Sequence, residues 1–262
     1  MLKTFLYLFA ILNIVACKNE RPSKSVTEHA QNIIDAAPDT AILNYLMGHF
    51  IPDSNENFVL IQPKHANRSG MYLRTEAYEA FNKMYDAALK DGIKLEIISA
   101  TRNFDYQKGI WERKWSGQTI LSSGENASLD FNNDSLRARK ILEYSSMPGT
   151  SRHHWGTDFD LNNLENAWFE KGEGLKLFNW LEKNASLYGF CRPYTRKGDA
   201  RPEGYNEEKW HWSYTPLSDS LTEYASRYLT NEMISGFLGS QTSEQINVVH
   251  NYILGIDHSC NH

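Results

Sequence analysis

The chain has 262 residues, of which 41% are hydrophobic and 13% aromatic, and it includes 7 Trp. This composition is typical of a globular protein and excludes a wholly disordered chain; the length suits one sizeable domain or two small ones. The formal net charge is −5, and no dense run of Lys and Arg occurs. These two features argue against nucleic acid as a partner.

The N-terminal segment combines a positive charge with a short apolar run. Lys3 is followed by the almost wholly apolar residues 4–16, and Cys17 comes directly after them. An apolar run of this length is too short to span a bilayer, so residues 1–16 are predicted to be a signal peptide. The sequence Ile14–Val15–Ala16–Cys17 resembles a bacterial lipobox, which implies that Cys17 carries lipid. The alternative is an ordinary signal peptide with an incidental cysteine.

A lipid on Cys17 would anchor the protein to a bacterial membrane, in the cell envelope, facing the periplasm or the exterior. Residues 17–41 are polar and are predicted to tether the lipid to a folded domain at 42–235. Residues 236–262 are expected to form a C-terminal extension. We expect a monomer.

Two further cysteines, Cys191 and Cys260, form an even pair once Cys17 is lipidated. In an oxidising compartment they can form a disulfide or remain as two free thiols, and the sequence leaves both alternatives open.

Hydrophobic periodicity predicts the elements of the folded domain. Thr75 is expected to cap the first long helix, and Gly92 to end it. In chain order the pattern predicts a helix at 75–90, a buried strand at 94–100, a helix at 135–144, a strand at 156–161, a helix at 175–188, a strand at 209–214 and a helix at 217–228. This mixture predicts an α+β fold with a small central antiparallel sheet flanked by helices.

Two segments concentrate side chains that can bind a metal. His153 and Asp160 lie in the first, and Glu208 and His211 in the second. A catalytic zinc requires three N or O ligands, an open position, and a nearby carboxylate that takes a proton from water. His153, Asp160 and His211 can supply the ligands, and Glu208 the proton acceptor. Gly156 would let the backbone turn tightly between the first two ligands.

The spacing of these residues resembles a known enzyme family. S-x-H-x-x-G-x-x-x-D at 151–160, followed by E-x-W-H at 208–211, resembles the VanY-type zinc D-alanyl-D-alanine carboxypeptidases, within the wider lysostaphin, D-Ala-D-Ala-peptidase and hedgehog-like fold group. Residues 99–107 resemble the family's S-x-x-R-S-x-x-x-Q segment, and the similarity spans roughly residues 70 to 216. The resemblance implies one zinc ion per chain, bound by His153, Asp160 and His211, with Glu208 as catalytic base. It further implies substrate contacts from Arg102, which would bind a terminal carboxylate, and from Gln107 in the same pocket.

Two positions depart from the family pattern. Asn103 replaces the usual Ser after the arginine, and Asp158 stands where the family has a small apolar residue. On a strand Asp158 shares a face with Asp160, so it could support a ligand, contact substrate or bind the metal itself. The spacing favours Asp160 as the ligand, and we assign Asp158 to substrate binding together with Ser151. His154 is expected to point away from the metal.

The resemblance implies hydrolysis of the C-terminal D-alanine of peptidoglycan stem peptides, by a D,D- or L,D-carboxypeptidase. A peptidoglycan endopeptidase, a D-Ala-D-Ala dipeptidase and a non-catalytic zinc-containing binding module are the alternatives. A pure binding module would not need Glu208, so the presence of Glu208 favours an enzyme. The chain has no G-x-S-x-G sequence, which argues against Ser151 as a nucleophile.

Overall fold

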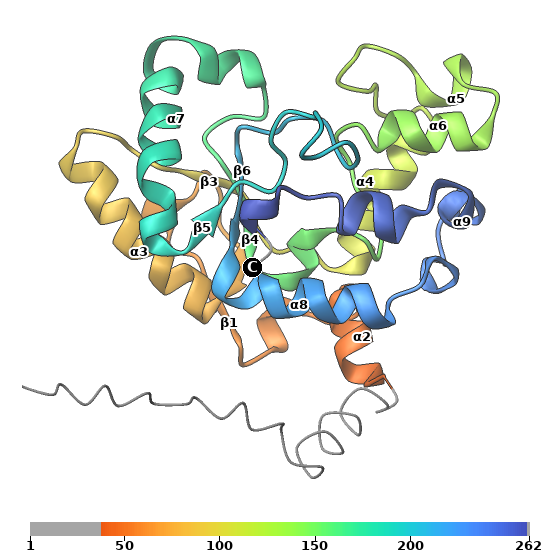
Figure 1. Cartoon of the computed structure of the whole chain (residues 1–262), viewed down its shortest axis with the longest axis horizontal. Coiled ribbons are helices and arrows are strands. Elements are labelled where there is room, and N and C mark those ends of the chain that lie inside the picture. The colour runs from red at the N-terminus through yellow and green to blue at the C-terminus, as the bar shows by residue number, and fades with distance from the viewer. Residues whose placement is uncertain (1–37, 261–262) are drawn as a thin grey trace, which may run out of the picture. The chain divides into compact units, whose positions relative to one another are not determined.

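A four-stranded antiparallel sheet lies at the centre of this computed structural model, which describes residues 38–260 (Figure 1). Its strands, in spatial order, are β3 (Ile97–Ser99), β4 (Asp158–Leu161), β6 (His211–Tyr214) and β5 (Phe190–Cys191). Each strand pairs with its neighbours in antiparallel fashion. All four residues of β4 are buried, because β4 lies inside the sheet and both of its faces are covered.

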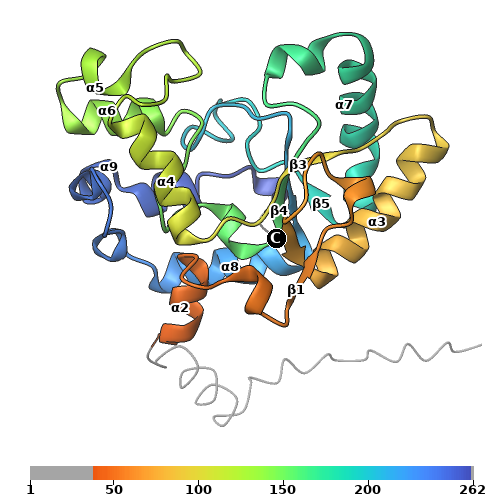
Figure 2. The same cartoon turned by 180° about the vertical axis from the view of Figure 1, so that it is seen from behind.

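One hydrophobic cluster packs the sheet against α3 (Thr75–Lys90) and α7 (Gly172–Asn184). Figures 1 and 2 show these two helices on the same side of the molecule. Phe159 of β4 packs against Phe81 of α3 and Phe190 of β5, with ring centroids 5.4 and 5.1 Å apart. A two-stranded sheet of β1 (Phe58–Leu60) and β2 (Tyr72–Arg74) leads directly into α3.

A second hydrophobic cluster lies on the other side of the central strands and contains Trp111, Trp115 and Trp155. Short helices surround it. They are α2 (Thr40–Leu46), α4 (Phe104–Trp115), α5 (Ala127–Asp130), α6 (Asp134–Ile141), α8 (Thr215–Tyr228) and α9 (Ser243–Ile246).

The C-terminal residues belong to this second cluster. Phe237, Ile246 and Ile253 are buried in it, and a disulfide joins Cys260 to Cys191 of β5, with Cα atoms 5.5 Å apart. The segment beyond residue 235 therefore shares its core with the rest of the compact unit, which begins at Pro38. The structure also resolves the alternative that the sequence left open, since the two cysteines are paired.

The predicted α+β class with a small antiparallel sheet is confirmed. The helix predicted at 75–90 is α3, but its N-cap is Arg74 and no side chain caps it, so the capping role assigned to Thr75 is wrong. The strand predicted at 94–100 is shorter, because only Ile97–Ser99 pairs in the sheet.

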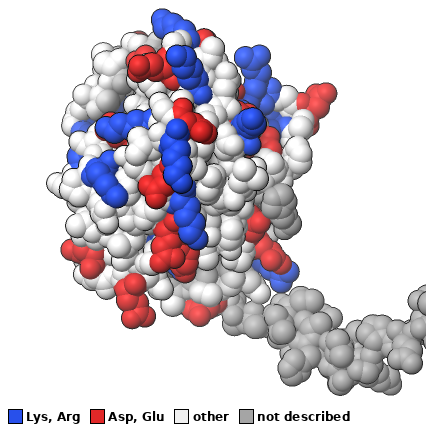
Figure 3. Space-filling model, turned by 90° about the vertical axis from the view of Figure 1, so that its left-hand side faces the viewer, with Lys and Arg blue, Asp and Glu red and all other residues white. Residues whose placement is uncertain are grey.

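Among residues 38–260, no helix is long and apolar enough to cross a membrane. The predicted signal peptide and Cys17 lie outside the described residues. On the face formed by α3 and α7, basic and acidic side chains are interspersed (Figure 3).

Candidate metal centre

The pairing of β4 with β6 brings two predicted ligands together. Asp160 and His211 are directly opposite each other in the register of these strands. Asp160 Oδ1 lies 3.3 Å from His211 Nδ1. Both side chains are almost fully buried, with 7% of the Asp160 side chain and 4% of the His211 side chain exposed.

The third predicted ligand comes from the turn before β4. His153 lies in a 3-10 helix, Arg152–Trp155, which ends at Gly156 in the left-handed conformation with φ of 71°. A Cβ atom at Gly156 would lie 2.3 Å from the ring of Phe58, so both the conformation and the space require glycine. The tight turn expected at Gly156 is therefore present. It places His153 Nε2 3.4 Å from Asp160 Oδ1.

Hydrogen bonds orient both imidazole rings. His153 Nδ1 is 2.9 Å from the carbonyl oxygen of Ala100, and a carbonyl can only accept, so Nδ1 carries the proton and Nε2 presents its lone pair. His211 Nε2 donates to Asp158 Oδ2 at 2.9 Å, which leaves Nδ1 facing Asp160. One ligand atom from each of His153, Asp160 and His211 lies within 4.8 Å of the others.

The charges of this cluster suit a cation. Oδ1 of Asp160 is buried and has no hydrogen-bond partner among the described residues. Burial and the positive charge of Arg102 lower the pKa of His153 to about 4, so its imidazole is neutral and free to bind a metal at neutral pH. Burial alone would lower the pKa of His211, but Asp158, Asp160 and Glu208 raise it well above its usual value. The carboxylates thus favour a positive charge at the centre, and two imidazoles with one carboxylate fit zinc.

Glu208 lies beside the three ligands. Its Oε2 is 3.2 Å from His211 Nδ1, and its backbone N–H donates to the carbonyl of Tyr194. Only 6% of the residue is exposed, and this burial raises the pKa of the carboxyl. A buried carboxylate next to the ligands, with a raised proton affinity, suits proton transfer.

These residues open into a cleft of about 540 Å³. Its walls include the three ligands and Glu208 together with Arg102 and Lys114. The backbone of Arg102 is fixed beside the ligands, because its N–H donates to the carbonyl of His153 and its carbonyl accepts from His154 Nδ1.

The chain matches the family model described as VanY, D-alanyl-D-alanine carboxypeptidase, over residues 70–217. This match covers more than half of the chain and includes every predicted ligand. The chain belongs to this family.

Individual relatives agree with this assignment. YodJ of Bacillus subtilis is 32% identical over 146 residues, which are 55% of this chain and 46% of that protein. A D-alanyl-D-alanine carboxypeptidase of Enterococcus faecalis is 25% identical over 144 residues, or 54% of this chain and 47% of that one. The chain therefore matches about half the length of these curated relatives.

Two solved structures are also similar. The LdcB LD-carboxypeptidase is 26% identical, with a TM-score of 0.48, and the match covers 66% of this chain and 79% of LdcB. VanYB, solved in complex with D-alanine-D-alanine, is 21% identical, with a TM-score of 0.47, and the match covers 68% of this chain and 88% of VanYB.

Asp158 does not line the cleft, so the structure contradicts its assignment to substrate binding. It is fully buried behind His211 and accepts hydrogen bonds from four side chains. The donors are Arg152 Nε at 3.1 Å, His211 Nε2 at 2.9 Å, Thr157 Oγ1 at 2.6 Å and Ser213 Oγ at 2.8 Å. Asp158 therefore orients a predicted metal ligand, which was one of the alternatives for this residue.

Of the other two residues predicted to contact substrate, one lines the cleft and one does not. Ser151 lines the cleft, and its buried Oγ has no hydrogen-bond partner in the part of the chain that the structure describes. Gln107 is fully buried and does not line the cleft, and its Oε1 has no hydrogen-bond partner among the described residues, so its contact with substrate stays a prediction. Its Nε2 donates to the carbonyl of Ser146, which does line the cleft. His154 is also buried away from the cleft, as expected.

Sequence reasoning missed several residues around the site. Arg152 is buried, and it pairs with Asp158 and donates to Thr222 and Ser213. The ring of Tyr194 packs edge-on against His211, with centroids 4.7 Å apart. The only sequence signal for Arg152 was its place in the segment 151–160, and a buried partner for a lone arginine cannot be identified before the strands are paired.

Proposed function

We propose that this chain is a zinc-dependent carboxypeptidase that removes the C-terminal D-alanine of peptidoglycan stem peptides. One observation supports the proposal most strongly. Three residues that could hold a metal, a buried carboxylate at Glu208, and Arg102, which has no ion-pair partner among residues 38–260, all face one cleft. Membership in the D-alanyl-D-alanine carboxypeptidase family supports the substrate class.

His153 Nε2, Asp160 Oδ1 and His211 Nδ1 are the atoms that would hold the zinc ion. Zinc bound there would polarise the scissile carbonyl and acidify a water molecule. Glu208 takes the proton of the attacking water and passes it to the leaving amine. Its raised pKa suits both steps, because the same carboxyl must accept a proton and then release it.

Arg102 makes the enzyme specific for a chain end. Its Nε is buried without a hydrogen-bond partner among residues 38–260, and no carboxylate in that part of the chain pairs with it. A guanidinium can hold a carboxylate through two parallel hydrogen bonds, so a free C-terminal carboxylate fits this position. A peptide held in this way presents its last peptide bond to Glu208.

The proposed location is the surface of a bacterial membrane, reached through a lipid on Cys17. Two acyl chains suffice for stable anchoring, and the lipobox-like sequence before Cys17 supports this location. We expect Cys17→Ser to move the protein out of the membrane fraction or to leave it unprocessed. Wild-type protein recovered wholly in the soluble fraction would contradict the anchor.

The test of the function compares two synthetic stem pentapeptides that differ only in their C-terminus, one a free acid and one an amide. Mass spectrometry should show loss of one D-alanine from the acid and almost none from the amide. Charge-assisted hydrogen bonds contribute about 1.5–3 kcal/mol, so Arg102→Ala should lower kcat/KM for the acid by about 10- to 150-fold.

Arg113→Ala serves as the matched control, because Arg113 is exposed on α4 and does not line the cleft. Zinc content should be unchanged in both variants. Equal cleavage of acid and amide, or cleavage within crosslinked peptides, would replace the carboxypeptidase by an endopeptidase. Hydrolysis of free D-Ala-D-Ala to two D-alanines, without cleavage of the pentapeptide, would indicate a dipeptidase. No cleavage of any of these substrates by the zinc-loaded protein would favour a binding module.

A further inference from the structure

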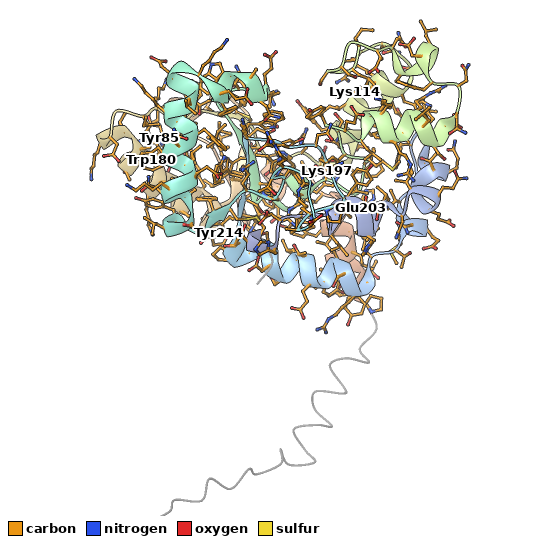
Figure 4. The ribbon with its side chains drawn as sticks, turned by 45° about the horizontal axis from the view of Figure 1, so that its top comes forward. Tyr85, Lys114, Trp180, Lys197, Glu203 and Tyr214 are labelled. Carbon is orange, nitrogen blue, oxygen red and sulfur yellow. A yellow bond between two sulfur atoms is a disulfide. The ribbon has the colours of Figure 1, made fainter. Side chains whose placement is uncertain are left out.

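Lys114 is a half-buried cation on the wall of the cleft. It lies on α4, on the opposite side of the molecule from α7 (Figure 4), and its Nζ donates a hydrogen bond to Ser145 Oγ. Within residues 38–260 it has no acidic partner. Two other lysines in this region do: Lys108 lies 3.8 Å from Glu112, and Lys140 lies 3.1 Å from Glu143.

Arg102 and Lys114 form a pair of like charges. Both line the cleft, and neither makes an ion pair in the described part of the chain. Burial and the positive charge of Arg102 lower the pKa of Lys114, while Glu208 acts in the opposite direction. Two cations that line one cleft and are partly withdrawn from water repel each other, and an anion bound in that cleft would offset both the repulsion and the lost hydration.

The substrate contains such an anion. A carboxylate offers two oxygens and about four lone-pair positions, so it can accept two bonds from a guanidinium and one more from an ammonium. We propose that Lys114 binds the terminal carboxylate of the peptide together with Arg102, as a residue that determines specificity for the free acid. This inference rests on the proposed function. The hydrogen bond from Nζ to Ser145, which also lines the cleft, fixes the ammonium on the cleft wall, so less side-chain entropy is lost when the carboxylate binds.

The test combines the acid and amide peptides with substitutions of Lys114. Lys114→Met should lower kcat/KM for the free acid by about 10- to 100-fold, because a charge-assisted hydrogen bond to the carboxylate is lost. With the amide, which has no charge to bind and which the wild type cleaves only slowly, kcat/KM should stay at the low wild-type value. Lys114→Arg should retain more activity on the acid than Lys114→Met, and Ser145→Ala should cause a smaller loss with the same preference.

Lys108→Met is the matched control, since it removes an equivalent charge from the same helix outside the cleft. It should leave both substrates unaffected. Circular dichroism and the thermal unfolding midpoint establish that Lys114→Met is folded. If it is unfolded, Lys114→Arg and Ser145→Ala provide the comparison.

Two results would overturn the inference. An unchanged kcat/KM of Lys114→Met on the acid would remove Lys114 from binding, and equal losses on acid and amide would place its action elsewhere in the cleft. Failure of wild-type enzyme to cleave either peptide would instead refute the proposed function. Calorimetric binding of D-Ala-D-Ala and its amide to the zinc-loaded protein would then decide the inference separately, with a loss of affinity in Lys114→Met expected for the acid alone.

Discussion

His153 and His211, the proposed imidazole ligands, form with Asp160 and Glu208 what we call the metal end of the cleft. A hydrogen bond fixes each of these two rings, from His153 to Ala100 and from His211 to Asp158. Arg102 and Lys114 line the same cleft, where they form what we call its cationic end, and they make no ion pair within residues 38–260. The first arrangement is complete within the protein itself, and the second leaves positive charge for a partner to neutralise.

This difference indicates what the metal end and the cationic end each contribute to catalysis and substrate binding. The metal end is preorganised, so folding already includes the cost of orienting its ligands. The cationic end gains its full set of contacts only when an anion binds. Substitutions at the metal end should therefore change zinc affinity and the chemical step, whereas substitutions at Arg102 and Lys114 should change the preference for a free carboxylate.

The largest effect is expected at Glu208, which belongs to the metal end but is not one of the three ligands. Glu208→Gln should lower kcat by about 10²- to 10⁴-fold, because the amide cannot accept the proton of water. Zinc affinity should stay close to that of the wild type, as measured by competition with a chromogenic chelator.

Glu207→Gln is the matched control, since Glu207 pairs with Arg192 and does not line the cleft. A Glu208→Gln enzyme that retains half of the wild-type kcat would move the proton acceptor to another group. The metal end would then no longer divide into three zinc ligands and a separate proton acceptor at Glu208.

Asp158→Asn should lower zinc affinity, which tests whether the hydrogen bond behind His211 preorganises the metal end. The amide oxygen can still accept from His211, but the negative charge is lost and Arg152 is left without its buried partner. Changes to groups that orient metal ligands typically cost about 10- to 100-fold in affinity or activity, and we expect zinc affinity to fall within that range. Activity at saturating zinc should recover in large part.

Asp160→Asn should weaken zinc binding more than Asp158→Asn, because it alters a ligand. Chelator competition on both variants, at a temperature where each is shown to be folded, checks the order. Loss of zinc from Asp158→Asn, together with retention of zinc by Asp160→Asn, would show that Asp158 and not Asp160 is the carboxylate ligand.

The sequence could predict those parts of the fold that have a local periodic pattern. The apolar stripe of α3 and the alternation in β4 are local patterns. α3 spans the predicted residues, whereas β4 begins two residues later than the strand predicted at 156–161, because Gly156 has the left-handed conformation. The pairs β1–β2 and the short helices α5 and α9 have too few residues for a periodic signal. The buried C-terminal segment carries apolar residues without a regular period, and its position is set by packing around Trp111 and by the disulfide.

At the site, residue spacing predicted the cluster of His153, Asp160 and His211, which the structure brings together. The partners behind them could not be predicted in the same way. The bond between Asp158 and His211 depends on the register of two strands that are 53 residues apart in the chain. That Lys114 and Arg102 line the same cleft depends on how α4 packs in the fold, and no short sequence pattern predicts that packing.

Substitution of Gln107 has the smallest expected effect on kcat/KM. It tests whether any residue besides Arg102 and Lys114 contacts the substrate carboxylate. The sequence pattern predicts this side chain in the substrate pocket. In the structure it does not line the cleft, and it donates at 2.7 Å to the carbonyl of Ser146, which does. A neutral hydrogen bond contributes about 0.5–1.5 kcal/mol net, and leucine fills a similar volume. Gln107→Leu should therefore lower kcat/KM for the free-acid pentapeptide by less than about tenfold, well below the loss in Arg102→Ala. A decrease as large as that of Arg102→Ala, and absent with the amide, would show that Gln107 contacts the carboxylate. Gln107 would then belong to the carboxylate-binding residues together with Arg102 and Lys114.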